Sequence, residues 1–116
     1  MMNYDPLDLD HGREDRTGFP EVVFGQGKTA EEIRRAVSEI AERSGKALAT
    51  RVDEKVGESI AQQIEDAEWH PRCRCIAVDR TKATPEGSVA IVCAGTSDLP
   101  VAQEALLTTQ MAGADA

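Results

Sequence analysis

The sequence contains no apolar run that approaches the roughly 20 residues of a membrane-spanning helix. Its amino terminus carries Asp5, Asp8 and Asp10 and lacks the basic-then-apolar order of a signal peptide. The three cysteines cannot all pair, and a disulfide between Cys73 and Cys75, one residue apart, would be strained. We therefore expect a soluble cytoplasmic protein with reduced thiols and no membrane partner.

An excess of basic residues is also missing. The 116 residues carry a formal net charge of −8, and the acidic residues are spread along the chain. Such a surface repels phosphate backbones over most of its area, so we expect no nucleic-acid partner. The length suffices for one modest hydrophobic core.

The pattern of apolar residues and turn signals predicts a small β-α-β-α-β domain over residues 19–84. The clearest local signal is a helix that starts with a capping box, Thr29 followed by Glu32, and closes at Gly45. Crossovers of this kind give parallel neighbouring strands. In order, the expected elements are strands at 21–24, 47–52 and 73–78, with helices at 30–44 and from 53 onward.

The two ends of the chain differ from this domain. Residues 1–18 have only scattered apolar positions and are expected to form a flexible arm. Residues 81–87 are typical of an interdomain linker. Within 85–116, the apolar run 89–93 is typical of a strand buried on both faces, and a helical pattern follows. We expect 85–116 to be the first strand and helix of an incomplete second domain.

The loop before that helix is the strongest candidate binding segment. Gly95 permits a close backbone approach, and Pro100 suits the first turn of a helix. Free N–H groups there favour an anion, Ser97 adds a hydroxyl, and Asp98 either accepts hydrogen bonds from a ribose or caps the helix. The predicted binding residues are Gly95, Thr96, Ser97 and Asp98.

The segment Gly25-Gln26-Gly27-Lys28-Thr29 invites comparison with a phosphate-binding P-loop. A P-loop needs four residues between its first glycine and the Gly-Lys pair, and here only Gln26 intervenes. The segment is better explained as a glycine turn with Thr29 as the helix cap.

His70, Cys73 and Cys75 are ligand types that zinc uses, but two cysteines one residue apart share a strand face at the wrong spacing for a zinc knuckle. No metal ligand is predicted, and the cysteines are interpreted as small buried apolar groups. Cys93 ends an apolar run and has no adjacent base, so it is not expected to be an activated thiol.

Arg51 lies inside the apolar second strand, where a guanidinium needs a partner. Two interpretations remain open. Arg51 either pairs structurally with a carboxylate or contacts a ligand or an interface.

Three stretches together resemble one family, in order and spacing. They are Gly-Phe-Pro-Glu-Val-Val-Phe-Gly with Gly-Lys-Thr at 18–29, Ala-Thr-Arg at 49–51, and Ala-Gly-Thr-Ser-Asp-Leu-Pro-Val-Ala at 94–102. They are similar to the nickel-pincer cofactor carboxylases, the LarB family, and the resemblance runs from about residue 12 to the carboxyl end.

This resemblance implies an enzyme that carboxylates the pyridinium ring of nicotinic acid adenine dinucleotide and cleaves its phosphoanhydride, giving AMP and a biscarboxylated pyridinium mononucleotide. It implies carbon dioxide or bicarbonate and magnesium as requirements, no covalently bound cofactor, and a homo-oligomer. It also implies a flavodoxin-like catalytic domain related to the purine carboxylase PurE, in which the loop with Ser97 and Asp98 holds phosphate and ribose.

The family's nucleophilic cysteine lies in the distal half of the catalytic domain, and nothing in this chain corresponds to it. No catalytic residue is therefore predicted, and the fragment alone is expected to be inactive. One rival is a PurE-type aminoimidazole ribonucleotide carboxylase or mutase, although Ala94 and Gly95 depart from the Gly-Ser of its motif. The other is a non-enzymatic interaction or oligomerisation module with Arg51 at its interface.

Overall fold

The computed structural model describes residues 21–81 and 84–116. The predicted arm, residues 1–18, lies outside the described residues. The α/β fold class predicted from the sequence is confirmed. The strands are β1 (Val23–Phe24), β2 (Lys46–Thr50), β3 (Ala67–His70) and β4 (Cys75–Asp79), and the helices are α2 (Ala30–Ser44), α3 (Glu54–Gln63), the short 3-10 turn η1 (Thr96–Asp98) and α4 (Leu99–Met111).

Helix α2 has the bounds and caps that the sequence predicts. The Thr29 hydroxyl accepts a hydrogen bond from the Glu32 N–H at 3.1 Å, and Glu32 Oε1 accepts one from the Thr29 N–H at 2.8 Å. Gly45 closes the helix at φ 79°, in the left-handed region that favours glycine. The buried stripe also matches the prediction and consists of Ile33, Ala36, Val37, Ile40 and Ala41.

The four strands form one sheet in the order β1-β2-β4-β3. Strands β1 and β2 are parallel, as expected, with Val23 opposite Ala49. Strand β4 lies between β2 and β3 and is antiparallel to both, so the expectation of parallel neighbours is wrong for β4. The physical reason is the turn at 71–74, which reverses the chain after β3 and returns it through the middle of the sheet.

The sequence interpretation missed β3 and began the third strand too early. Ala67–His70 pairs with β4 through Trp69 opposite Ile76 and His70 opposite Cys75. The pattern Ala-Glu-Trp-His lacks β-branched residues and is short, so its strand signal is weak. The second strand also ends before residue 52, because Arg51 adopts φ 57° and leaves the extended conformation.

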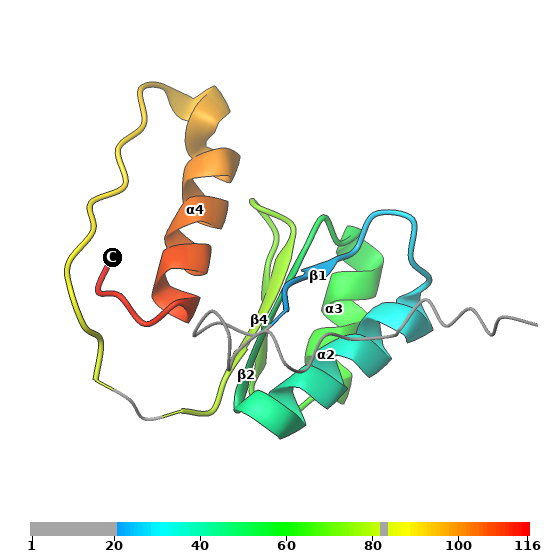
Figure 1. Ribbon diagram of the computed structural model, residues 1–116. Coiled ribbons are helices and arrows are strands. Elements are labelled where there is room, and N and C mark those ends of the chain that lie inside the picture. The colour runs from blue at the N-terminus through cyan, green and yellow to red at the C-terminus, as the bar shows by residue number, and fades with distance from the viewer. Residues whose placement is uncertain (1–20, 82–83) are drawn as a thin grey trace, which may run out of the picture.

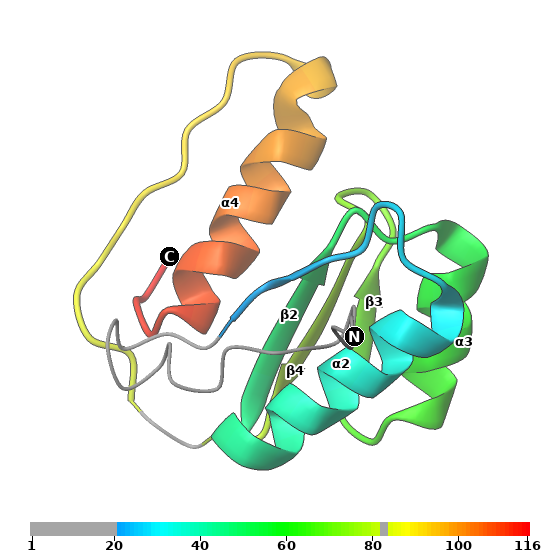
Figure 2. The same cartoon turned by 45° about the vertical axis from the view of Figure 1, so that its right-hand side comes forward.

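Both faces of the sheet are covered. Helices α2 and α3 pack on one face, and α4 packs on the other (Figures 1 and 2). Alternate residues of the strands divide between the two faces, as the period of a strand requires. The face toward α2 and α3 buries Ala47, Ala49, Ile76 and Val78. The face toward α4 buries Leu48, Cys75 and Ala77 against Leu107 and Met111.

The apolar run 89–93 is not a strand of the sheet, which corrects the sequence prediction. It runs beside α4 in extended form (Figure 1), Val92 is 88% exposed, and the bridge nearest to it joins Ser88 to Asp115. An apolar run becomes a doubly buried strand only where other strands flank it, and none does so among the residues that the structure describes. The helical pattern that follows is confirmed as α4. The predicted domain boundary near residue 85 stays a prediction.

Within residues 21–81 and 84–116, no helix is long and apolar enough to span a membrane.

Candidate functional site

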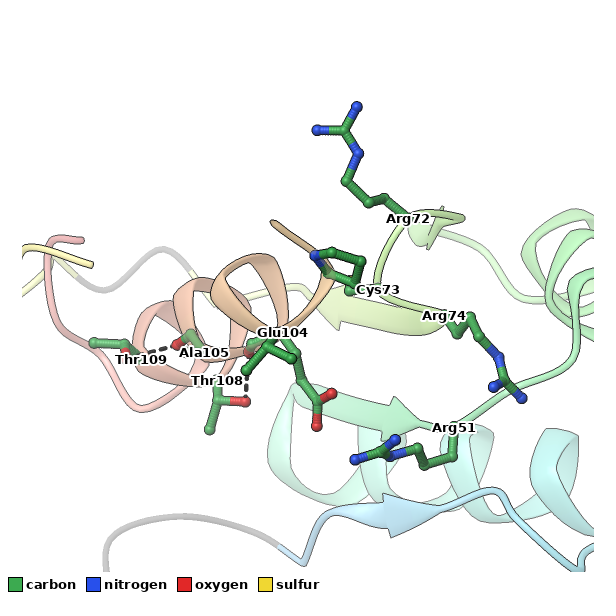
Figure 3. Close-up of a pocket in the computed structure, with 10 residues that line it drawn as sticks. Arg51, Arg72, Cys73, Arg74, Glu104, Ala105, Thr108 and Thr109 are labelled. Carbon is green, nitrogen blue, oxygen red and sulfur yellow. Dashed lines mark hydrogen bonds between the residues drawn. The ribbon is translucent and has the colours of Figure 1, made fainter. Parts of the chain in front are cut away.

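A pocket of about 570 Å³ opens between one side of α4, from Pro100 to Thr109, and the end of the sheet where β2 stops and β4 starts. Its floor and walls come from two turns of the sheet domain and from one face of the helix (Figure 3). The lining residues are Arg51, Arg72, Cys73, Arg74, Pro100, Val101, Glu104, Ala105, Thr108 and Thr109.

The two turns that carry the arginines are bonded to one another. The Val52 N–H donates to the Arg74 carbonyl at 3.0 Å, and Arg74 Nε donates to the Val52 carbonyl at 3.3 Å. Arg51 and Arg74 both adopt left-handed backbone angles, with φ of 57° and 58°. A side chain with a Cβ is disfavoured there by roughly 1–2 kcal/mol. These bonds and angles fix where the two arginine side chains leave the backbone.

The charges around the pocket are mostly unpaired. Within the part of the chain that the structure describes, no salt bridge joins Arg51, Arg72 or Arg74 to a carboxylate. Glu104 is the one acidic residue of the lining. Figure 3 shows its carboxylate and the Arg51 guanidinium directed toward the same space between α4 and the sheet, whereas Arg72 and Arg74 extend in other directions. Three arginines against one glutamate leave an excess of two positive charges.

The Cys73 thiol lies in the lining of this pocket and the Cys75 thiol lies buried beside it. Burial disfavours the reactive thiolate form of both. Burial raises the pKa of the Cys73 thiol, and it raises the pKa of Cys75 far above its usual range. The Glu104 carboxylate adds to both shifts, and the Arg51 cation opposes that of Cys75. Cys75 Sγ donates to the Cys73 carbonyl at 3.3 Å. Both cysteines are free and buried, which confirms their interpretation as small apolar core groups, and Cys93 is exposed.

The predicted binding loop lies at the amino end of α4 but does not line the pocket. Gly95 adopts φ 95°, so the position favours glycine through its backbone angle. Thr96, Ser97 and Asp98 form η1 and are exposed. Asp98 makes no capping hydrogen bond to the helix, so the capping interpretation of its carboxylate is not what the structure shows. Pro100, which follows, does line the pocket.

Of the residues singled out in the sequence, Arg51, Cys73 and Pro100 line the pocket, and Gly95, Thr96, Ser97 and Asp98 do not. Arg51 has no carboxylate partner among the residues that the structure describes, and both interpretations of its role stay predictions. Sequence reasoning missed Arg72, Arg74 and Glu104. A usable signal was present in Arg72-Cys73-Arg74-Cys75, where apolar thiols alternate with charged side chains as in a strand with one buried face.

No group of three or more His, Cys, Asp or Glu side chains that could hold a metal ion occurs in residues 21–81 and 84–116. Lys28, the lysine of the rejected P-loop comparison, donates from Nζ to the Phe24 carbonyl at 2.8 Å and so stabilises the glycine turn.

Comparison with known proteins places the chain in a family. Residues 2–80, more than half of the chain, match the family described as the LarB/PurE-like N-terminal domain. An uncharacterized protein of Methanocaldococcus jannaschii is 37% identical over 117 residues, which cover 95% of this chain and 46% of that protein. The chain thus spans about half the length of the curated relative it matches. The resemblance noted in the sequence is confirmed, and the chain belongs to the LarB/PurE-like N-terminal domain family.

Proposed function

We propose that this chain is the amino-terminal part of an enzyme that carboxylates the pyridinium ring of nicotinic acid adenine dinucleotide and hydrolyses its phosphoanhydride. The products are AMP and a biscarboxylated pyridinium mononucleotide. Membership of the LarB/PurE-like family supports a relation to carboxylases. The wider sequence resemblance, which continues past residue 80 into the loop at 94–102, favours the dinucleotide over a purine precursor.

The observation that carries the proposal is the state of Asp98. Its carboxylate is exposed at the start of α4 and makes no capping hydrogen bond, so it is available to accept hydrogen bonds from a ribose. The Ser97 hydroxyl and the amino end of α4, with its partial positive charge, suit an adjacent phosphate. In this proposal Gly95, Thr96, Ser97 and Asp98 bind substrate, and the reacting cysteine belongs to a part of the protein outside this chain.

Magnesium and bicarbonate belong to the proposed reaction as requirements of the whole enzyme. In this proposal the part of this chain in the reaction is to bind and orient the dinucleotide.

The test uses a full-length protein that contains this chain. It is incubated with nicotinic acid adenine dinucleotide, bicarbonate and magnesium, and AMP and the carboxylated product are measured by chromatography and mass spectrometry. Release of both products supports the proposal. Turnover of aminoimidazole ribonucleotide in place of the dinucleotide would establish the purine-type rival. If neither substrate reacts or binds, the interaction-module interpretation replaces both.

A further inference from the structure

The space between α4 and the sheet holds one positive and one negative side chain that face each other, and the proposed function uses neither. They are the Arg51 guanidinium, from the turn after β2, and the Glu104 carboxylate, from α4 (Figure 3). We infer that this pocket binds a small zwitterion with an apolar body, such as a free amino acid with a large apolar side chain. Its carboxylate contacts Arg51 and its ammonium group contacts Glu104. The inference does not depend on the proposed function.

Arg51 and Glu104 line the same pocket but are not paired with each other. In residues 21–81 and 84–116, no salt bridge joins either side chain to a charged partner. Both charges nevertheless act on one buried thiol. Burial is the main cause that raises the pKa of Cys75, the Glu104 carboxylate adds to the rise, and the Arg51 cation opposes it. The two charges therefore surround one space and remain too far apart to bond across it.

The packing of α4 keeps this gap open. Glu104, Leu107 and Met111 follow one another at helical spacing and share a face of α4. Leu107 and Met111 are 8% and 4% exposed and pack on the sheet, whereas Val101, almost one turn before Glu104, is 71% exposed. The helix is thus anchored to the sheet by its last turns. The turn that carries Glu104 lies toward the open end of the pocket.

The backbone on the sheet side of the gap is also constrained. Arg51 adopts φ 57°, and the adjacent Val52 N–H donates to the Arg74 carbonyl at 3.0 Å, which ties the turn to its neighbour. Residues held in such left-handed conformations cluster at ligand sites. Because the side chains of Arg72 and Arg74 extend away from this space, Arg51 alone offers a guanidinium to a ligand there (Figure 3).

The threonines of the lining offer no hydroxyl proton to a ligand. Thr108 Oγ1 donates to the Glu104 carbonyl at 2.8 Å, and Thr109 Oγ1 donates to the Ala105 carbonyl at 2.7 Å. Both hydroxyl protons are therefore used within α4. The charged groups that remain for a ligand in this space are one guanidinium and one carboxylate.

This pair of opposite charges selects against ligands of a single charge. An anion at Arg51 meets the repulsion of Glu104, and a cation at Glu104 meets the repulsion of Arg51. A molecule that carries both charges is attracted at both ends. The planar fork of a guanidinium matches a carboxylate, and an ammonium group offers three donors to the glutamate oxygens.

The size and walls of the pocket indicate that the ligand also has an apolar part. A volume of about 570 Å³ lies in the range of small-molecule sites and leaves room beyond two charged groups. Pro100, Val101 and Ala105 give the α4 side an apolar wall. An apolar side chain of the ligand would cover the exposed part of Val101 and remove apolar surface from water.

The experiment titrates the isotope-labelled 116-residue chain with L-phenylalanine and follows the NMR shifts of the backbone amides at Arg51 and at 101–105. Phenethylamine, which lacks the carboxylate, and phenylpropionate, which lacks the ammonium group, are titrated in the same way. We expect saturable binding of L-phenylalanine and about tenfold weaker binding of each analogue, as loss of a charged hydrogen-bond partner predicts.

Two variants assign the charges. Arg51→Asn, which tolerates the left-handed angle, should weaken L-phenylalanine binding about tenfold and strengthen phenethylamine binding severalfold, because the opposing cation is gone. Glu104→Gln should also weaken L-phenylalanine binding about tenfold, and it should strengthen phenylpropionate binding severalfold. A variant that simply loses its fold would weaken all three ligands, and thermal melting of each variant checks this directly.

The matched control is Arg72→Gln, which removes the same charge from the lining at a side chain that extends away from the gap (Figure 3). It should leave L-phenylalanine binding within twofold of the parent. Shifts that do not saturate, or an analogue that binds as tightly as L-phenylalanine, would overturn the inference. Equal weakening by Arg72→Gln and Arg51→Asn would also overturn it, because net charge would then govern binding.

Discussion

The ring of Trp69 lies directly on Gly57, so that a Cβ added at Gly57 would stand 2.2 Å from Trp69 Cε3. Gly57 lies in the middle of α3, and Trp69 lies in β3, the strand that follows this helix in sequence. The absent side chain at position 57 lets the helix approach the sheet closely enough for the indole to cover it.

Gly57→Ala should therefore destabilise the protein, although alanine favours a helix by roughly 1 kcal/mol over glycine. No real Cβ stands so close to a ring, and relief requires the indole or α3 to move, at a cost of about 1–3 kcal/mol. The free energy of unfolding is measured by urea titration. Glu58→Ala, an exposed change in the same helix, is the control and should have little effect. A stabilised Gly57→Ala would show that α3 does not contact Trp69 in this way.

The buried thiols predict a pH dependence of stability. Cys75 has a pKa raised by burial in the folded protein, whereas in the unfolded chain it lies near 9.0. Above that pH the unfolded chain binds fewer protons than the folded one, so the free energy of unfolding should fall as pH rises. Melting temperatures between about pH 8 and 10.5 measure the slope.

Cys75→Ala should make this slope shallower, and Cys93→Ala, which changes an exposed thiol, should not. Equal slopes in both variants and the parent would mean that other groups carry the whole effect. In the native protein a thiol reagent at pH 8 should modify Cys93 quickly, and Cys73 and Cys75 only after unfolding.

Asp98 gives a prediction that separates stability from binding. Because its side chain makes no capping hydrogen bond, Asp98→Ala should leave the melting temperature of the 116-residue chain nearly unchanged, whereas loss of a true cap costs about 0.5–2 kcal/mol. In the full-length protein Asp98→Asn should weaken dinucleotide binding by about tenfold. Dinucleotide binding by Asp98→Asn that equals the parent's would remove Asp98 from the proposed site.

The division into domains predicts the behaviour of a shorter chain. Residues 19–84 contain α2, α3 and the whole sheet, so this piece should melt cooperatively. Its melting point should be lower than that of the 116-residue chain, because Leu48 and Ala77 lose the cover of Leu107 and Met111. Differential scanning calorimetry measures both. A piece without a cooperative transition would place α4 within the first folding unit.

The parts of the fold that the sequence predicts correctly are those set by local signals. Thr29, Glu32 and Gly45 determine the ends of α2 through bonds within a few residues, and the apolar stripe fixes which face is buried. Strand order depends on contacts between distant segments. No residue near Ala49 or Ile76 in the sequence indicates that these two residues pair. The periodicity of apolar residues therefore could not predict that β4 lies between β2 and β3.

The residues of the candidate pocket also divide into those that local signals indicate and those that only tertiary contacts bring together. Arg51 could be predicted as a candidate residue because a charged side chain within an apolar strand is a local signal. Arg72, Arg74 and Glu104 join it only through the pairing of β2 with β4 and the docking of α4, both of which are tertiary contacts. The loop from Gly95 to Asp98 was predicted from local signals, its glycine and the proline at the start of the following helix, and the family resemblance supports the same loop.

The direction of β4 brings Arg51 and Arg74 to the same end of the sheet. Because β4 is antiparallel to β2, the residue that precedes β4 stands beside the residue that follows β2, although Arg51 and Arg74 are far apart in sequence. Had β4 run parallel to β2, its five residues would have put Arg74 at the other end of the sheet, roughly 15 Å away at about 3.3 Å per residue. Two arginines 23 positions apart in sequence are thus neighbours because of the strand topology, and a change of strand direction would separate them without a change in either residue.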